Sequence, residues 1–242
     1  MSIKAGSILL AAALPLAGCG MLSGREAARD DSAVPSSEFP AAARPISQIG
    51  SSRWSTEIER DRVKEADRAM DLVGVAAGMT VADIGAGEGY YTIRLAARVG
   101  AKGRVLAQDI IPAVRDKLAD RVYRDKLDNV SVKLGAANDP KIPADSFDRV
   151  FMMHMYHEIG APYEFLWRLR ASLVKGGEVV IVDADRPTSA HGIPPGLLKC
   201  ELAAVGYSQR SVTPMPQKGV YLAVFTLAGA RPEPGAIKVC RG

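Results

Sequence analysis

Three glycines placed two residues apart, directly after a short apolar run, constrain the fold more than any other feature of this 242-residue chain. Residues 81–91 read Val-Ala-Asp-Ile-Gly-Ala-Gly-Glu-Gly-Tyr-Tyr and lead into a pattern of apolar residues at helical spacing. Because glycine has no Cβ, a loop built on Gly85, Gly87 and Gly89 can adopt unusual dihedral angles and let a ligand lie against its backbone. The first amides of the following helix favour anionic groups in the same space. The segment therefore predicts a strand, a tight ligand-binding loop and a helix.

Two acids near this loop indicate the kind of ligand that it binds. Asp83 precedes Gly85 by two residues, so a dinucleotide pyrophosphate at the loop would meet a carboxylate and lose Coulomb energy. S-adenosylmethionine has no phosphate, and its ammonium can pair with Asp83 while its carboxylate faces the loop amides. Asp109 follows Gly89 by twenty residues and is placed to accept both ribose hydroxyls, a role that both ligand classes share. The Gly-x-Gly-x-Gly spacing also differs from the Gly-x-Gly-x-x-Gly of dinucleotide sites, which disfavours a nicotinamide-dependent oxidoreductase.

Four segments in this order resemble motifs of the class I S-adenosylmethionine-dependent methyltransferases. Residues 81–91 look like the first motif of that family, and residues 105–110 look like the acidic end of its second strand. Residues 146–151 resemble the entry to its fourth strand, and residues 175–180 resemble the turn into its fifth. The resemblance covers about residues 55–227 and implies S-adenosylmethionine as the cofactor. It also implies an α/β fold: a single Rossmann-like, seven-stranded, mostly parallel sheet with helices on both faces and the final strand reversed.

The hydropathy pattern of the chain fits this fold. Stretches with apolar residues at helical spacing alternate with short apolar runs that are typical of buried strands. Right-handed crossovers between parallel strands would place all the ligand loops at one edge of the sheet. Besides the first two strands, we expect helices at residues 56–75, 91–99, 112–127, 162–173 and 196–204, and strands at residues 130–134, 149–155, 178–183, 209–213 and 221–227.

The resemblance also assigns individual residues to the cofactor. Ile110 is placed to pack on the adenine, although ordinary burial explains an isoleucine there equally well. Asn138 and Asp139 follow the third expected strand, where the family reads the adenine amino group, and a plain Asx turn before Pro140 is the alternative. His154 is expected to contribute its backbone. The expected cofactor-binding residues are Asp83, Gly85, Ala86, Gly87, Gly89, Asp109, Ile110, Asn138, Asp139 and His154.

Residues 154–158 follow the fourth expected strand and are expected beneath the sulfonium. Methyl transfer is an in-line displacement, so the enzyme mainly aligns the acceptor with the methyl group and removes a proton where the acceptor carries one. His157 is the candidate base, because an unperturbed imidazole titrates at about pH 6.5. The alternative is a histidine that shapes the loop through a hydrogen bond to the backbone.

Several chemistries are disfavoured. No Asn/Asp-Pro-Pro-Tyr stretch follows the fourth expected strand, which disfavours methylation of base amino groups or glutamine amides, and no cysteine lies there for the covalent cytosine mechanism. We expect no metal, because the three histidines and the scattered acids show no ligand spacing. A weaker alternative is that Asp183 and Asp185 match the acids that bind a divalent ion in catechol-type relatives.

Two functions remain. The first is methyl transfer to a small-molecule or lipid-like acceptor. The second is a non-catalytic module of the cell envelope that binds S-adenosylmethionine or S-adenosylhomocysteine without turnover. The formal net charge of +4 includes no cluster of Lys and Arg interleaved with aromatic residues, so we expect no nucleic-acid partner.

The N-terminal residues are typical of a targeting signal. Lys4 precedes an apolar stretch, residues 8–17, that is too short to span a bilayer comfortably. Residues 16–19 read Leu-Ala-Gly-Cys and resemble the bacterial lipoprotein box, which implies that Cys19 is lipidated and becomes the first mature residue. The alternatives are an ordinary secretory signal or an uncleaved anchor. Gly20 stands where an aspartate would indicate retention at the inner membrane, so we expect the outer membrane, facing the periplasm, with a cytoplasmic protein as the alternative.

The residues after the signal contain too little apolar surface to offset the entropy of ordering them. Cys200 and Cys240 are the other two cysteines. Outside the cytoplasm they pair, or they remain as one buried and one free thiol, and the sequence leaves both arrangements open. We expect four segments: a signal peptide at residues 1–18, a lipidated and disordered tether at 19–50, a methyltransferase domain at 51–230 and a C-terminal tail at 231–242.

Overall fold

The computed structural model describes residues 33–50 and 56–241, and residues from Val34 onward form one compact unit. The expected signal peptide and Cys19 lie outside the described residues. Of the helices within the described ranges, none combines the length and the apolar character needed to cross a membrane.

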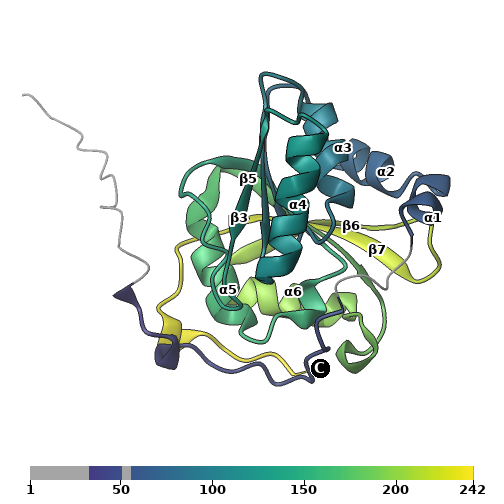
Figure 1. Cartoon of the computed structure of the whole chain (residues 1–242). Helices are drawn as coiled ribbons and strands as arrows, with labels where there is room; N and C mark the ends of the chain where they lie inside the picture. The colour runs from purple at the N-terminus through teal and green to yellow at the C-terminus, as the bar shows by residue number, and fades with distance from the viewer. Residues whose placement is uncertain (1–32, 51–55, 242) are drawn as a thin grey trace, which may run out of the picture. The chain divides into compact units, whose positions relative to one another are not determined.

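A seven-stranded sheet forms the centre of this unit, with the strand order β3-β2-β1-β4-β5-β7-β6 (Figure 1). The first five strands run parallel, and β7 is antiparallel to both of its neighbours. The expected fold is confirmed, including the reversed final strand. The strands are β1 (Thr80–Ile84), β2 (Arg104–Asp109), β3 (Val130–Leu134), β4 (Phe147–Met153), β5 (Leu173–Ala184), β6 (Tyr207–Pro214) and β7 (Val220–Leu227).

The helix expected ahead of β1 is in fact two helices. The first begins with a capping box, in which Thr56 Oγ1 accepts from the Glu59 amide at 3.3 Å and Glu59 Oε2 accepts from the Thr56 amide at 3.2 Å. Lys64 then adopts a left-handed conformation with φ 53°, and the turn folds Arg60 back onto Glu65 at an N–O distance of 2.6 Å. The other elements begin and end within five residues of their expected limits. The helices are α1 (Glu57–Arg62), α2 (Glu65–Leu72), α3 (Tyr90–Val99), α4 (Pro112–Arg124), α5 (Pro162–Leu169) and α6 (Pro195–Ala204).

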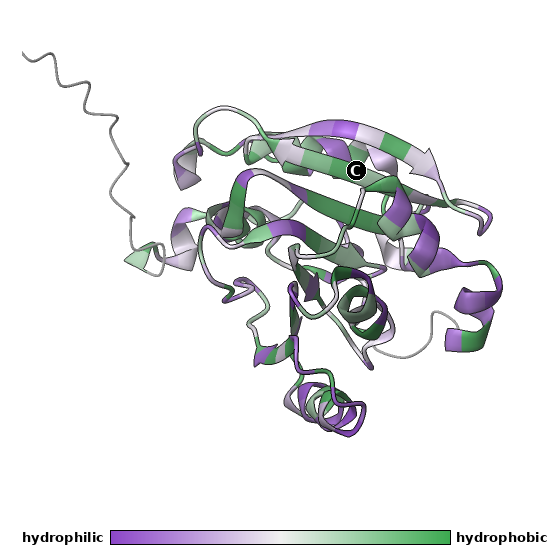
Figure 2. Cartoon of the chain, turned by 90° about the horizontal axis from the view of Figure 1, so that it is seen from above, coloured by the Kyte–Doolittle hydropathy of each residue, from purple (hydrophilic) through white to green (hydrophobic). Residues whose placement is uncertain are grey.

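Both faces of the central strands are buried, because successive side chains point to opposite faces of a sheet. On one face Phe151 and Val180 pack with apolar residues of α2 and α3. On the other face Val150 and Val179 pack with apolar residues of α5 and α6. The hydrophobic colour of the central strands in Figure 2 follows from this double coverage. Only the ends of the strands then remain for a ligand, and the loops after β1, β2 and β4 meet at the carboxyl edge.

Residues 34–50, here called the N-terminal strap, pack against the sheet and its helices. This corrects the expectation of a disordered tether that extends to residue 50. Arg44 is 7% exposed, and its Nε forms a 2.8 Å ion pair with Oε1 of the fully buried Glu201. Its other nitrogens donate to the backbone carbonyls of His157 and Ile159. The buried guanidinium of Arg44, with all these partners, holds the strap against the domain. The apolar surface of the strap alone is too small to order it.

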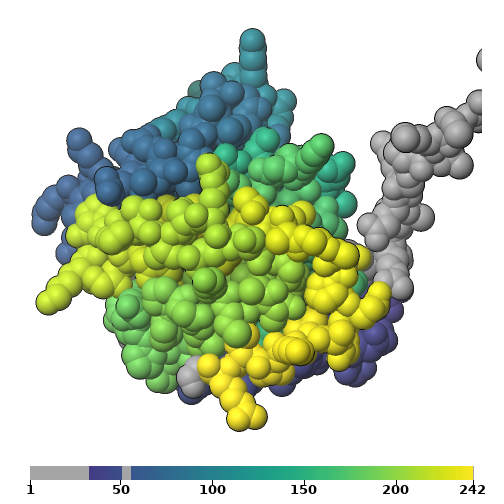
Figure 3. Space-filling view, turned by 180° about the vertical axis from the view of Figure 1, so that it is seen from behind, coloured from purple at the N-terminus to yellow at the C-terminus, as the bar shows by residue number. Residues whose placement is uncertain are grey.

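The C-terminal tail lies beside this strap. Ala43 forms a parallel β-bridge with Arg241, and the Cys240 amide donates a 2.7 Å hydrogen bond to Tyr163 Oη. Figure 3 shows the tail in yellow crossing the surface and reaching the purple strap at the lower edge. Cys240 also forms a disulfide with Cys200 of α6, which resolves the alternative that the sequence left open.

Removing the disulfide should destabilise the fold without changing it. Residues 200 and 240 enclose a separation of 40 residues, and the chain-entropy relation for a loop of this length gives about 4 kcal/mol. In a Cys19→Ser background, which leaves only these two cysteines, we expect Cys200→Ser with Cys240→Ser to lower the free energy of unfolding in urea by up to that amount. Two free thiols in the unreduced, denatured parent protein would contradict the pairing.

Candidate functional site

A cavity of about 450 Å³ opens at the carboxyl edge of β1, β2 and β4, within the size range of small-molecule sites. Backbone and side chains from seven separate segments line it. The lining residues include the strap residues Ile49 and Gly50, the α1 residues Thr56, Glu57 and Arg60, the loop residues Ile84 to Glu88, Tyr90, the β2 residues Gln108 and Asp109, Ile110, Ile111, Ala136, Ala137, Met153, His154, Met155, Glu158, Ile159 and Phe165.

The glycine loop lies against this cavity in the conformation that its sequence predicts. Gly85, Gly87 and Gly89 have φ values of 66°, 56° and 88°, which side chains rarely adopt. A Cβ on Gly85 would lie 3.0 Å from Cγ of Met155, and a Cβ on Gly89 would lie 2.5 Å from Cδ1 of Leu118. Gly85 and Gly87 line the cavity together with Ala86, whereas Gly89 turns the chain into α3 and lies behind the wall.

Asp109 connects the end of β2 to the glycine loop. Its Oδ2 accepts a 3.0 Å hydrogen bond from the Gly87 amide, and its Oδ1 accepts a 2.9 Å hydrogen bond from the Ile111 amide. The side chain lines the cavity, and each carboxylate oxygen has a second lone pair that can accept from a ribose hydroxyl. Gln108, which the sequence did not single out, supports the same loop, because its Oε1 accepts from the Gly85 amide at 3.3 Å.

Asp83 lies beneath the loop and not in the cavity wall. It is 2% exposed, and its Oδ2 accepts a 2.6 Å hydrogen bond from Thr92 Oγ1 of α3. Burial raises the pKa of Asp83 to about 6, against the lowering effect of the Thr92 hydrogen bond. A cationic group bound above the loop would favour the ionised form. Asp83 therefore acts on a ligand through its charge and not as a residue of the cavity lining.

A buried polar network in the wall was not visible in the sequence. Glu65 is fully buried, and its Oε1 accepts from Arg60 at 2.6 Å, accepts from Tyr91 Oη at 3.1 Å and lies 3.3 Å from His154 Nε2. Burial would raise the pKa of Glu65, but the contacts with His154 and Arg60 outweigh it and hold the pKa at about 2. The ionised carboxylate fixes Arg60 at the cavity wall, where the guanidinium also stacks 3.8 Å from the ring centroid of Tyr90.

The two candidates for reading the adenine lie elsewhere. Asn138 Nδ2 donates to Glu164 Oε1 at 2.9 Å, and Asp139 Oδ1 accepts from the amide two residues further on, as in an Asx turn. Neither residue is part of the cavity lining, which instead includes Ile110 and residues 136–137. The loop after β3 thus presents its backbone to the cavity and uses the two polar side chains to hold itself in place.

At the opposite end of the cavity, the candidate base His157 lies behind an acid. His157 is 1% exposed, and its Nδ1 lies 2.9 Å from both carboxylate oxygens of Asp183. Its Nε2 lies 4.0 Å from Oε1 of Glu158, which lines the cavity. Burial raises the pKa of Glu158, although a 2.9 Å hydrogen bond from the Gly50 amide acts in the opposite direction. Glu158 is therefore the acid that faces the cavity here, and His157 lies behind it.

Comparisons with known proteins fit this arrangement. Residues 81–177 match a protein family described as "Methyltransferase domain". The chain is similar to a tRNA U34 carboxymethyltransferase from Colwellia psychrerythraea, with 34% identity over 142 residues that cover 56% of this chain and 40% of the relative. It is 43% identical over 86 residues to nocamycin O-methyltransferase from Saccharothrix syringae, covering 35% of this chain and 30% of the relative. The chain thus spans less than half the length of these relatives.

Solved structures agree in fold. A SAM-dependent methyltransferase from Aquifex aeolicus superposes with a TM-score of 0.67 at 22% identity, covering 75% of this chain and all of that protein. The fold is that of the class I methyltransferases. An arsenic(III) S-adenosylmethionine methyltransferase from Chlamydomonas reinhardtii has the same fold, with a TM-score of 0.51 at 19% identity over 64% of this chain and 65% of that one. The methyltransferase domain match and these neighbours support S-adenosylmethionine as the cofactor.

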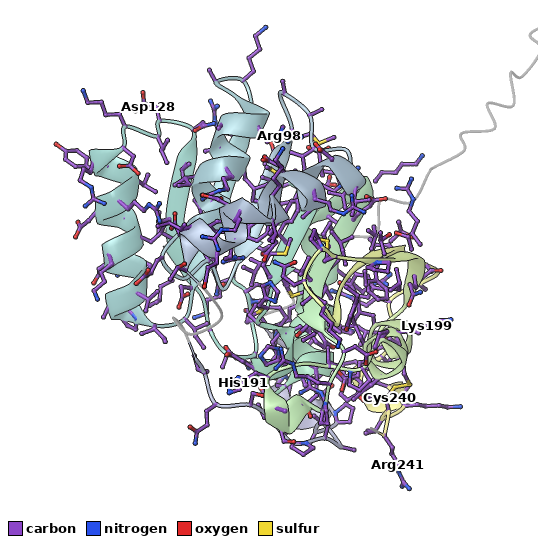
Figure 4. All side chains as sticks on the ribbon, turned by 90° about the vertical axis from the view of Figure 1, so that its right-hand side faces the viewer. Arg98, Asp128, His191, Lys199, Cys240 and Arg241 are labelled. Carbon is purple, nitrogen blue, oxygen red and sulfur yellow. A yellow bond between two sulfur atoms is a disulfide. The ribbon has the colours of Figure 1, made fainter. Side chains whose placement is uncertain are left out.

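Asp109→Ala should weaken binding of S-adenosylhomocysteine by about a hundredfold or more. The substitution removes two charge-assisted hydrogen bonds to the ribose, which contribute about 1.5–3 kcal/mol each at most. The matched control is Asp128→Ala: Asp128 is an exposed acid before β3, and Figure 4 shows it at the far side of the molecule from His191. Calorimetric titration of both variants measures the effect, and equal affinities would contradict the role of Asp109.

Proposed function

We propose that this chain is a S-adenosylmethionine-dependent methyltransferase that acts on a small-molecule or lipid-like acceptor. The observation that carries the proposal is the carboxylate of Asp109, which lines the cavity while it is bonded to the Gly87 amide. The contact supports a ribose acceptor beside the loop amides in the cavity wall. A titratable acid, Glu158, lines the same cavity.

The lining offers partners for each part of the cofactor. Asp109 would accept from the ribose hydroxyls, and Ile110 with residues 136–137 would pack on the adenine. Arg60, whose guanidinium is held by Glu65, and the loop amides would hold the methionine carboxylate. Met155 would then lie on the side of the sulfonium.

Methyl transfer mainly requires that the acceptor is aligned with the methyl group. A lone pair of the acceptor attacks the methyl carbon as the bond between carbon and sulfur breaks, and S-adenosylhomocysteine leaves without its positive charge. An acceptor hydroxyl must also lose a proton. The paired side chains of Glu158 and His157, with Asp183 behind them, are the groups at the acceptor end that can take it.

The acceptor end of the cavity favours a compact, largely apolar acceptor. Its wall combines the apolar side chains of Ile49, Met155, Ile159 and Phe165 with the carboxylate of Glu158. Such a wall matches a ring or an acyl-like group that carries one ionisable hydroxyl. It opposes a polyanion such as nucleic acid, because the carboxylate would repel the phosphates.

A transfer assay tests this function. Protein incubated with S-adenosylmethionine carrying a tritiated methyl group should label a component of an organic-solvent extract of the cell envelope, and Glu158→Gln should lower kcat by about 10²–10⁴-fold. Binding of S-adenosylhomocysteine should be unchanged by Glu158→Gln, since the acid lies at the acceptor end. Intact binding without labelling of any organic or aqueous extract would favour the non-catalytic binding protein instead.

We also propose that residues 1–18 are a signal peptide and that Cys19 is lipidated and anchors the chain in the cell envelope. The disulfide between Cys200 and Cys240 supports this location, because disulfides persist in oxidising compartments. Since the ordered strap begins at Val34, the link from Cys19 is short, and covalent geometry limits its reach to about 50 Å. The domain would thus act close to a lipid surface.

Metabolic labelling with tritiated palmitate tests the anchor. The wild type should carry the label and sediment with membranes, whereas Cys19→Ala should lose the label. A Cys200→Ser variant should keep the label, since Cys200 belongs to the disulfide. Unlabelled wild-type protein in the soluble cytoplasmic fraction would overturn the anchor and leave an ordinary cytoplasmic methyltransferase.

A further inference from the structure

The three histidines of the chain are His154, His157 and His191. His154 lines the wall and contacts Glu65. His157 and His191 lie together with Glu158, and each of these three residues offers one ligand atom within 4.8 Å of the others. This cluster could not be predicted from residue spacing, because His191 follows Glu158 by 33 residues.

The ring of His157 is already oriented as in many metal sites. Its Nδ1 lies 2.9 Å from both carboxylate oxygens of Asp183, and the other ring nitrogen, Nε2, lies 4.0 Å from Oε1 of Glu158. Asp183 is fully buried and is itself fixed by a 2.8 Å hydrogen bond from the Ala184 amide. A carboxylate that orients a histidine in this way is the usual outer-shell partner of a metal-bound imidazole. Asp183 therefore serves as an orienting residue, which differs from the direct ligand role considered for it from the sequence.

Glu158 and His191 complete the cluster from two other directions. Glu158 ends the short 3₁₀ helix η3 (Tyr156–Glu158), and its half-buried side chain lines the cavity. His191 follows η5 (Thr188–Ala190) in a left-handed conformation with φ 54°, and its amide donates to Ser47 Oγ of the strap at 3.3 Å. The rings of His157 and His191 meet edge to face, with their centroids 5.6 Å apart. Figure 4 shows His191 at the rim of the molecule, where an ion can enter from solvent.

We propose that His157, Glu158 and His191 bind a divalent transition metal ion of the zinc class. Two histidines and one glutamate are a ligand set of catalytic zinc sites, which keep a fourth position open. Tetrahedral ligands at about 2.05 Å from zinc lie about 3.3 Å from one another. The 4.0 Å between His157 Nε2 and Glu158 Oε1 must close by less than an ångström, which rotation of the glutamate side chain achieves.

The position of this site gives the ion a role at the acceptor. Glu158 also lines the cavity, so the open coordination position faces the acceptor end. An ion held there would lower the pKa of an acceptor hydroxyl, so that the hydroxyl could give its proton to water before its oxygen displaces S-adenosylhomocysteine from the methyl carbon. In that state Glu158 is a ligand and not the base. This role rests on the proposed function, whereas binding of the ion does not.

Zinc titration of the mature, oxidised protein tests the site. We expect one Zn²⁺ per chain by calorimetry, and we expect the Co²⁺-substituted wild type to show the visible absorption of a four-coordinate site. His191→Ala should weaken zinc binding at least a hundredfold, and Asp183→Asn should weaken it about 10–100-fold. The matched control is His154→Ala, which removes the histidine outside the cluster and should leave zinc binding unchanged.

Binding of S-adenosylhomocysteine is measured on the same samples. Because His191 is exposed, its replacement leaves the core intact, and retained cofactor affinity verifies the fold. A wild type that binds S-adenosylhomocysteine but no Zn²⁺, or equal zinc affinity in the wild type and His191→Ala, would overturn the metal site and leave the proposed function standing. A wild type that binds Zn²⁺ at this cluster but not S-adenosylhomocysteine would support the site and contradict the proposed function.

Discussion

The carboxylate of Asp109 joins the two loops that form the cofactor end of the cavity. It accepts the Gly87 amide of the loop after β1 and the Ile111 amide that follows β2. This bridge forms only because β1 and β2 are parallel neighbours whose carboxyl ends meet at one edge. The strand order, the glycines that let the loop turn and the acid that ends β2 thus act as one unit. The proposed binding of the cofactor rests on this geometry.

Local signals in the sequence were sufficient for the fold and for the cofactor loop. Glycine spacing and hydropathy period are properties of neighbouring residues, so the loop at 85–89 and the positions of the strands could be predicted, and the family resemblance implied the mostly parallel sheet. Contacts between residues far apart in the sequence could not be predicted in this way. The ion pair of Arg44 and Glu201 joins residues 157 apart and orders a strap that reads as a linker, and Glu65 reads as a surface acid although it is fully buried. The position of Asn138 could not be predicted for a related reason, because its partner Glu164 lies on α5.

Part of the cavity wall comes from segments that the family match does not cover. Residues 81–177 supply the glycine loop, Asp109 and Glu158. The strap contributes Ile49 and Gly50 to the cavity wall, and His191 lies beyond the match on the other side. Since these segments shape the acceptor end, the acceptors of the relatives need not be shared. The strap is also the segment that leads back toward Cys19, so the proposed anchor and the acceptor end belong to one stretch of chain.

Paired calorimetric titrations with S-adenosylhomocysteine and NADH test the central claim most directly, namely that this cavity is built for a phosphate-free adenosyl ligand. The account predicts one S-adenosylhomocysteine per chain and no heat from NADH, because the Asp83 carboxylate beneath the loop disfavours a pyrophosphate there. Binding of NADH without binding of S-adenosylhomocysteine would contradict it.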